Sequence, residues 1–247
     1  TLDRSSAASD VYKRQNNEST MKNQVAFSVK GRYALFSDPI TRVGGEKFSY
    51  LIPTYEALKG IACSIYWRPT FTWVIDKVRI MKSIQTESKS VKPLMYYGGN
   101  QLSIYTYLSD VTYQVLAHFE WNEQRADMMN DRIDGKHFSV AQRMIERGGR
   151  RDIFLGTREC QGYVEPCVFL EGKGFYDSVE EMTFGLMFHG FDYPDTTGLA
   201  ELTGRFWYPV MKDGIVEFIR PELCPIKERR RAMTSSPPVV NSSEGDC

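Results

Sequence analysis

Apolar and polar residues alternate along several stretches of the chain, which predicts strands. In the first of these stretches, Val25, Phe27 and Val29 fall on one face and more polar residues on the other. A period of two residues is typical of a strand with one buried face. The strands predicted in this way, in chain order, are 24–30, 70–84, 105–108, 111–121 and 152–155. The third and fourth form a pair that is interrupted at Ser109 and Asp110.

A period of three to four residues predicts the first helix. We expect it to open at Pro53, at a first-turn position where the missing N–H of proline costs little. It ends near Tyr66 and Trp67, because Arg68 precedes a proline and is pushed out of helical geometry. Its apolar face consists of Tyr55, Leu58, Ala62 and Ile65. Two irregular stretches predict loops, at 36–51 and 87–101.

A second, shorter helix is preceded by a Lys-His pair. We expect Ser139 to cap this helix, with Gln142 completing a capping box, and the glycine pair 148–149 to end it. Lys136 and His137 then lie at the positive end of the helix dipole, where a phosphate is favoured. On spacing alone, a solvated lysine and a histidine that packs at the helix entry explain the same pattern, because surface Lys-His pairs are common.

The predicted elements over residues 24–156 follow the order β-α-β-β-α-β, the ferredoxin-like or RRM-like arrangement of an α+β fold. No RNP1-type aromatic motif is present, so RRM-style base stacking on the sheet is not supported. From Cys160 onward the chain is glycine-rich, and its strand candidates are 183–189, 202–210 and 215–219. We expect four segments: a non-native or disordered leader (1–20), a ferredoxin-like domain (21–158), a β-rich C-terminal extension (159–225) and a disordered tail (226–247).

Charge is unevenly distributed on a chain that is neutral overall. Residues 21–100 contain 12 Lys and Arg against 5 Asp and Glu, whereas residues 101–225 contain 12 against 20. A basic half beside an acidic half predicts one face that binds a polyanion. No apolar run approaches the roughly 20 residues that cross a bilayer, so we expect no membrane partner.

The cysteines and histidines do not show the spacing of a metal site. None of the five cysteines forms a C-x-x-C pair, and no histidine stands at a ligand spacing from one. The chain also has no G-x-x-x-x-G-K phosphate-binding sequence. We therefore expect reduced thiols in a cytoplasm, no metal and no cofactor.

Several blocks of sequence together resemble one family. They are YALFSDP (33–39), GGEK (44–47), PTYEALKGI (53–61), SIYW (64–67), GKH (135–137), GGRRDIFLG (148–156), RECQGYV (158–164) and HGF (189–191). Over about residues 21–225 the chain resembles the CRISPR-associated Cas-five family in its subtype I-C form, the "d" subgroup once called Dvulg. The resemblance implies an endoribonuclease that cuts precursor CRISPR RNA in the repeat hairpin. It also implies a subunit that stays on the 5′ handle of the guide RNA, with other subunits of the type I-C surveillance complex (Cascade) in antiviral defence.

The resemblance further implies a catalytic trio of Tyr66, Lys136 and His137. RNA carries its own nucleophile, the 2′-OH, so such an enzyme needs no metal and yields a 2′,3′-cyclic phosphate and a 5′-OH. In that chemistry Lys136 offsets charge on the phosphate, and His137 transfers a proton. Tyr66 is a poor base unless a nearby cation favours its ionised form, so the choice between Tyr66 and His137 as the base stays open. Without the resemblance, a core aromatic at a helix end explains Tyr66 equally well.

Seven cations are candidates for salt-sensitive contacts to the RNA backbone: Arg42, Lys47, Lys59, Arg68, Arg143, Arg150 and Arg151. We expect His118 and His189 to be structural or surface histidines. An alternative function is a non-catalytic scaffold that only binds the 5′ handle of the guide RNA. A third, general binding of duplex DNA, is permitted by the basic half of the chain, but nothing in the sequence specifies it.

Overall fold

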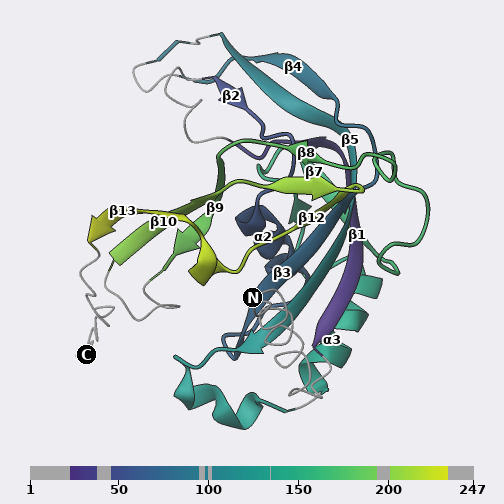
Figure 1. The fold of residues 1–247 in the computed structure, drawn as a ribbon. Coiled ribbons are helices and arrows are strands. Elements are labelled where there is room, and N and C mark those ends of the chain that lie inside the picture. The colour runs from purple at the N-terminus through teal and green to yellow at the C-terminus, as the bar shows by residue number, and fades with distance from the viewer. Residues whose placement is uncertain are drawn as a thin grey trace, which may run out of the picture.

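The computed structural model describes residues 23–37, 46–94, 98–99, 102–133, 135–193 and 201–232 of the 247-residue chain. These residues form a large curved sheet, a smaller sheet and two α-helices, which confirms the α+β class (Figure 1). The helices are α2 (Tyr55–Ile65) and α3 (Lys136–Glu146), and the 3-10 helices are η2 (Ala126–Asp131) and η3 (Pro221–Leu223). Within the described ranges no helix is long and apolar enough to span a membrane.

The large sheet has the strand order β6-β7-β1-β5-β3-β12-β11-β8, with β2 and β4 also paired to β5. Its strands are β1 (Gln24–Ala34), β2 (Lys47–Phe48), β3 (Phe71–Ile80), β4 (Thr86–Val91), β5 (Ser103–Trp121), β6 (Ile153–Phe154), β7 (Gln161–Pro166), β8 (Met182–Thr183), β11 (Val210–Lys212) and β12 (Ile215–Glu217). Its strand pairs are antiparallel except β2 with β5. The smaller sheet has the order β13-β10-β9 and contains β9 (Met187–Asp192), β10 (Glu201–Trp207) and β13 (Ile226–Ala232).

The predicted strands 24–30 and 70–84 correspond to β1 and β3, and the predicted pair 105–108 and 111–121 corresponds to β5, which lies between them. The last predicted strand is different: of residues 152–155 only Ile153 and Phe154 form a strand, and this strand pairs with β7. The place beside β1 is taken by β7, which comes later in the chain. The ferredoxin-like arrangement therefore stays a prediction, with β7 where the simple pattern expects 152–155.

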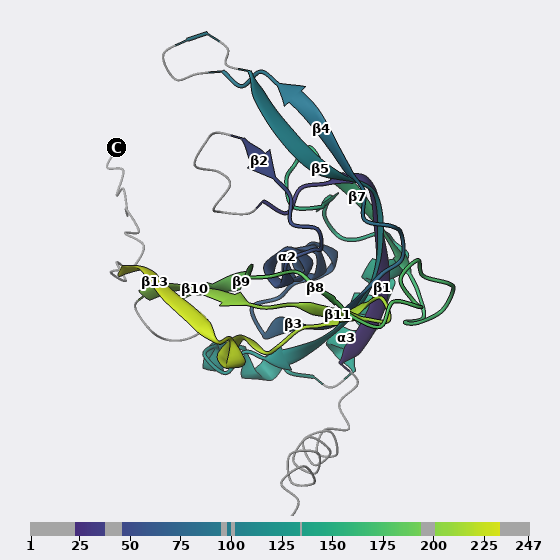
Figure 2. The same ribbon diagram turned by 45° about the horizontal axis from the view of Figure 1, so that its top comes forward.

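The predicted break at Ser109 and Asp110 is wrong, because β5 runs through both residues. Asp110 adopts a left-handed backbone, φ 51°, which aspartate tolerates better than most residues, so the strand bends without ending. The predicted loop 87–101 is wrong in its first part. Residues 86–91 form β4, which pairs with the N-terminal part of β5 (Figure 2). In the predicted loop 36–51, Lys47 and Phe48 form β2, and residues 38–45 lie outside the described part.

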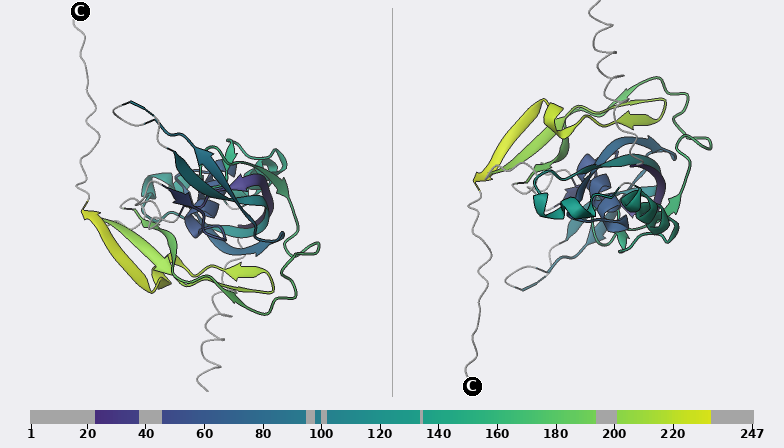
Figure 3. Two further views of the ribbon diagram at one scale, coloured as in Figure 1. Left: turned by 90° about the horizontal axis from the view of Figure 1, so that it is seen from above. Right: turned by 90° about the horizontal axis from the view of Figure 1, so that it is seen from below.

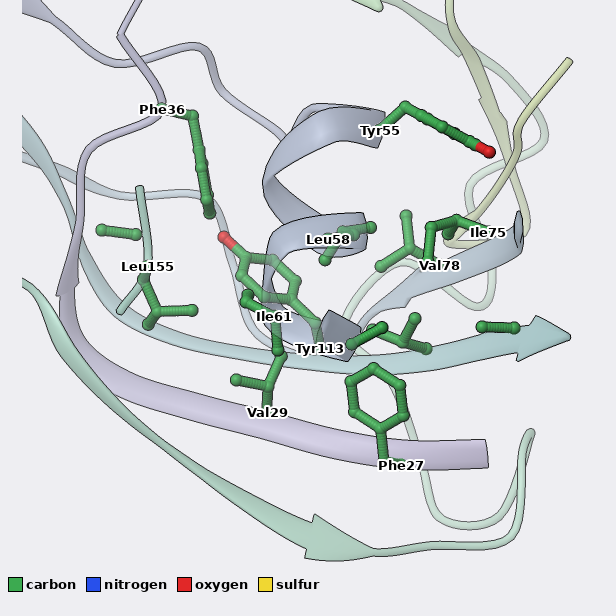
Figure 4. Close-up of a cluster of buried hydrophobic side chains, with 14 of the residues drawn as sticks. Phe27, Val29, Phe36, Tyr55, Leu58, Ile61, Ile75, Val78, Tyr113 and Leu155 are labelled. Carbon is green, nitrogen blue, oxygen red and sulfur yellow. The ribbon is translucent and has the colours of Figure 1, made fainter. Parts of the chain in front are cut away.

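Helix α2 packs its apolar face against the concave side of the large sheet. Leu58 and Ile61 face Val29 and Tyr113 of the neighbouring strands β1 and β5 (Figure 4). The predicted start at Pro53 is two residues early, because the helix begins at Tyr55. Thr54 caps the helix, since its hydroxyl oxygen accepts the N–H of Ala57 at 3.2 Å.

Helix α3 begins earlier than predicted. Gly135 is its N-cap with φ 70°, and Ser139 lies inside the first turn, where its hydroxyl donates to the Gly135 carbonyl at 2.9 Å. The predicted capping box at Ser139 and Gln142 is therefore wrong. The predicted end is confirmed, because Gly148 and Gly149 both have positive φ and close the last turn. Lys136 and His137 are consequently the first two residues of the helix.

The C-terminal strands divide between the two sheets. β12 pairs with β3 and extends the large sheet, while β9, β10 and β13 form the second sheet beside α2 (Figures 2 and 3). The predicted strands 183–189, 202–210 and 215–219 overlap these elements. The predicted tail is wrong for residues 226–232, which form β13, and its remainder and the leader 1–20 lie outside the described residues. The boundary between domain and extension near residue 158 stays a prediction.

Candidate active site

Tyr66 lies at the C-terminal end of α2, where the chain leaves the helix. Its N–H donates to the Ala62 carbonyl at 3.0 Å, and its own backbone is extended. The Trp73 indole N–H donates to the Tyr66 carbonyl at 2.7 Å, which satisfies a carbonyl that the helix leaves free. The phenol ring is buried and packs against Phe71, with ring centroids 5.5 Å apart. The end of α2 therefore fixes the orientation of the Tyr66 ring.

The hydroxyl of Tyr66 lies 2.9 Å from Nδ1 of His137. Nε2 of the same imidazole lies 2.7 Å from the backbone carbonyl oxygen of Asp131. A carbonyl only accepts hydrogen bonds, so Nε2 carries a hydrogen and donates it. In the neutral imidazole Nδ1 is then the acceptor, and the Tyr66 hydroxyl donates to it. This pair provides a direct path for a proton from Tyr66 to His137.

Aromatic rings enclose the His137 imidazole. Phe71, Phe119 and Trp121 lie with ring centroids 5.3, 6.4 and 5.7 Å from it, and the side chain is only 1% exposed. Both ring nitrogens are already hydrogen-bonded inside the protein. The oxygen of Tyr66 is the atom of the pair that retains acceptor capacity for a further hydrogen bond.

Asp131, at the end of η2, connects Lys136 to this pair. Its carboxylate accepts hydrogen bonds from Nζ of Lys136 at 2.5 Å and from the hydroxyl of Thr70 at 2.7 Å. The bond from Lys136, and next that from Thr70, hold the pKa of Asp131 below its usual range, so this carboxyl is ionised. The carboxylate oxygen that accepts from Thr70 also lies 3.4 Å from Nε2 of His137, close enough for its charge to stabilise a protonated imidazole.

Asp131 and Thr70 are residues of this site that the sequence did not reveal. Asp131 lies in the same polar stretch as the Lys-His pair, and its nearness in sequence is the only signal for it. Thr70 sits in the turn before β3, and nothing in its spacing points to the site. The three residues of the predicted trio are brought together, with Lys136 joined to the others through Asp131.

The predicted RNA-binding residues do not form one patch. Lys59 lies on α2, and Arg68 lies just after Tyr66. Arg143 lies on α3, where its Nε is 3.3 Å from the Ser139 carbonyl oxygen. Lys47 is on β2 at the opposite end of β5, with Nζ 4.7 Å from the Tyr105 ring centroid. Arg42 lies outside the described residues.

Arg150 and Arg151 belong to the loop that follows α3. Their backbone N–H groups donate to the carbonyls of Ile65 and Ser64 at 3.1 and 3.0 Å, so this loop closes the C-terminal end of α2. Both residues line a cavity of about 580 Å³ together with Arg147, Asp152 and Tyr163. Three arginines against one aspartate at this cavity suit an anionic ligand such as a phosphate.

The other histidines have structural surroundings. His118 lies on the opposite face of β5 from the core and is hydrogen-bonded to Asp76 and Glu120. His189 is fully buried and stacks on Tyr55, and burial lowers its pKa to about 3. The four described cysteines are free thiols. Among the residues that the structure describes, no group of three or more His, Cys, Asp or Glu is arranged to hold a metal ion.

Comparison with known proteins adds to this geometry. The family model Cas5d, described as "CRISPR-associated protein (Cas_Cas5)", matches residues 25–219. The "CRISPR pre-crRNA endoribonuclease Cas5d" of Mannheimia succiniciproducens is 25% identical over 224 residues, which cover 80% of this chain and 95% of the relative. Solved structures also match, among them two that share most of their length with this chain.

The first structure is described as that of a CRISPR-associated protein. It has a TM-score of 0.73 and 36% identity, and the match covers 85% of this chain and 100% of that one. The second, a functionally uncharacterized protein of Streptococcus mutans, has a TM-score of 0.68 and 39% identity, covering 83% and 96%. The family model spans most of the chain, and the description of the first structure agrees with it. The protein therefore belongs to the Cas5d family of CRISPR-associated proteins.

Proposed function

We propose that this protein is an endoribonuclease that cleaves precursor CRISPR RNA, as the name of its Mannheimia relative states for that protein. The observation that supports this function most is the hydrogen bond between the Tyr66 hydroxyl and His137 Nδ1 at the start of α3. A proton-accepting imidazole behind a hydroxyl, with a lysine and a helix N-terminus beside them, suits attack on a phosphodiester.

In the proposed mechanism Tyr66 contacts the RNA and His137 acts through it. The 2′-OH gives its proton to the Tyr66 oxygen, while the Tyr66 proton passes to His137 Nδ1. The 2′-oxygen bonds to phosphorus and the bond to the 5′-oxygen breaks, which leaves a 2′,3′-cyclic phosphate and, after the 5′-oxygen takes a proton from water, a 5′-OH. The carboxylate of Asp131 stabilises the imidazolium that forms.

Lys136 acts on charge rather than on the proton of the 2′-OH. Lys136 is the first residue of α3, so its ammonium group and the positive end of the helix dipole both favour the negative charge that develops on the phosphate. This division of roles needs no divalent metal, and cleavage in EDTA tests that part of the proposal.

We further propose that the protein remains on the 5′ handle of the product as a subunit of a type I-C surveillance complex in a prokaryotic cytoplasm. The half-buried Lys59, the exposed Arg68 and the arginine cavity of Arg150 and Arg151 support RNA binding at several separate contacts. We also propose a ferredoxin-like core in which β7 holds the fourth strand position. The elements that support it are β1, α2, β3, β5, α3 and the β6–β7 pair.

The test is single-turnover cleavage of a labelled repeat hairpin RNA in EDTA. We expect Tyr66→Phe to slow cleavage about 10²- to 10⁴-fold while leaving RNA affinity within about twofold, because only the hydroxyl is lost. An RNA with 2′-deoxy at the attacking position should not be cut. Tyr208→Phe, at an exposed tyrosine between β10 and β11, is the matched control and should cleave like wild type.

The pH dependence tests the position of His137 behind Tyr66. The wild-type rate should fall at acid pH, because a protonated imidazole cannot accept the Tyr66 proton. His137→Ala should cleave slowly and lose that acid-side decline. Tight RNA binding without cleavage in EDTA would favour the non-catalytic scaffold. Cleavage by Tyr66→Phe at the wild-type rate would show that this site is not the active site, and the family assignment would stand.

A further inference from the structure

A cleft of about 640 Å³ opens beside the C-terminal half of α2, between that helix, the start of β3 and the residue after β9. We call it the Trp67 groove, and its walls include Lys59, Trp67, Phe71, Trp73, Arg125 and Tyr193. Its volume lies in the range of about 300–1,000 Å³ that is usual for sites of small ligands.

Two aromatic side chains of the groove face solvent. Trp67 is 49% exposed and Tyr193 is 42% exposed, while Phe71 and Trp73 are buried and form the floor. Partly exposed rings above a firm apolar floor are a surface on which a nucleobase can stack, since every base has a π-face.

The charge of the groove matches a nucleic acid. Lys59 and Arg125 line it, and none of the described residues that line it is acidic. Lys59 forms no ion pair with any residue that the structure describes, whereas Arg125 is paired with Asp127. The adjoining cleft toward η3 is different, because four acidic residues line it against three cations: Glu120, Glu123, Asp192 and Glu222 against Lys59, Arg205 and Arg220. A polyanion is therefore favoured in the first cleft and not in the second.

The Trp67 groove lies next to the hydrogen-bonded pair of Tyr66 and His137. Trp67 follows Tyr66 directly in an extended segment, and Trp73 holds the Tyr66 carbonyl. The ring of Phe71 contacts the rings of both Tyr66 and His137 and also lines the groove. An RNA strand whose 2′-OH reaches the Tyr66 oxygen thus has the groove beside it.

We propose that the Trp67 groove binds the unpaired nucleotide next to the cleaved phosphodiester, with its base stacked on Trp67 and its phosphate at Lys59. This inference rests on the proposed function and specifies part of its substrate, a single-stranded flank beside the hairpin. Trp67 is a positioning residue for the scissile bond: it sets where the strand lies and takes no part in proton transfer.

The experiment uses the repeat hairpin RNA with 2′-deoxy at the attacking position, carrying 2-aminopurine on one or the other side of the scissile bond. Wild type should quench one of the two fluorophores on binding. Trp67→Ala should remove that quenching and weaken binding about 5- to 150-fold, the loss of one stacked base. Trp67→Phe should retain most of both, and Tyr208→Ala, at another half-exposed aromatic, should match wild type.

An abasic nucleotide in place of the quenched one makes the test independent of the variant's folding. The abasic RNA should bind wild type more weakly by the same factor, and it should bind Trp67→Ala as tightly as the intact RNA does. Unchanged quenching and affinity in Trp67→Ala, with wild type cutting the all-ribose hairpin, would overturn this inference alone. A wild type that neither binds nor cuts the hairpin would overturn the proposed function and this inference together.

Discussion

His118 links β5 to the strand beside it and, through Glu120, to Arg220 near η3. Burial opposes its charge, but the hydrogen bonds and charges of Asp76 and Glu120 outweigh burial and raise its pKa from 6.5 to about 9. The hydrogen bond from His118, aided by Arg220, lowers the pKa of Glu120 to about 2. The stability that His118 contributes is therefore fully present below about pH 6.5 and is lost as the pH rises through about 9.

We expect His118→Gln to lower the free energy of unfolding by up to about 3 kcal/mol at pH 6, and by much less at pH 10. Urea denaturation of both proteins at the two pH values measures this difference. Because Glu120 contributes above about pH 4.5, the effect should be complete between about pH 4.5 and 6.5. An equal loss at pH 6 and pH 10 would show that His118 contributes only by packing.

At the same scale, the residue types of the active site were predictable but their connections were not. Tyr66, Lys136 and His137 carry side chains with a chemical signature, and the resemblance pointed to all three. Their roles depend on neighbours that have no such signature: the backbone carbonyl of Asp131 fixes the tautomer of His137, and Phe71 encloses the imidazole. A backbone carbonyl is present at every residue, so no sequence pattern marks the one that fixes a histidine tautomer.

At the scale of the elements, Gly156 closes the turn between β6 and β7 against the end of β1. Its φ is +95°, and a Cβ added there would overlap the carbonyl of Leu35. Gly185 has a similar φ of +69° with nothing within 4 Å of an added Cβ. We expect Gly185→Ala to cost about 1 kcal/mol of backbone strain and Gly156→Ala about 3 kcal/mol or more, because it adds a steric clash.

Denaturant unfolding of the two glycine variants beside wild type measures this contrast. Similar losses in both would mean that the β6–β7 turn moves to accommodate a methyl group. Such movement would also shift Leu155, whose carbonyl accepts the N–H of Leu35 at 3.0 Å.

Element type followed the hydrophobic pattern where one face is buried and not where both faces meet solvent. The buried faces of β1, β3 and α2 have clear periods, and those elements were predicted. The sequence of β4, Thr86–Val91, is polar with both faces largely exposed, so it carries no alternation although it pairs along β5. The start of α3 was misplaced because Ser139 is a good cap by type, while Gly135 at a left-handed φ provides the actual one.

At the scale of the whole molecule, segments from the C-terminal part cover the sheet on both faces. Helix α2 lies in the hollow of the large sheet, with the small sheet against its far side (Figure 2). On the opposite face of the large sheet, the segment between β7 and β8 is held by Arg79 of β3. Its guanidinium group donates to Asp177 at 2.8 Å, to the Gly172 carbonyl at 2.9 Å and to Gln114 at 3.2 Å.

The ion pairs Arg79–Asp177 and Lys77–Glu217 join β3 to the C-terminal part, and they should contribute different amounts to the free energy of unfolding. Arg79 is 5% exposed and Asp177 is its partner, so Asp177→Asn leaves a buried guanidinium without a counter-charge. We expect a loss of about 2–3 kcal/mol in the free energy of unfolding, below the 3–5 kcal/mol of fully buried pairs because Asp177 itself is partly exposed. Lys77 and Glu217 are both exposed, so Glu217→Gln is the matched control and should cost less than about 1 kcal/mol.

Urea denaturation in low salt and in 1 M NaCl separates the two pairs further. The small effect of Glu217→Gln should vanish in high salt, where exposed charges are screened beyond about 3 Å, while the Asp177→Asn loss should persist. The same comparison bears on how the molecule folds as a unit. If Asp177→Asn lowers the stability of the whole protein in one transition, the segment between β7 and β8 is part of the cooperative core. If instead the main transition is unchanged and only that segment becomes susceptible to proteolysis, Arg79 attaches a separately unfolding cover to a sheet that is stable without it.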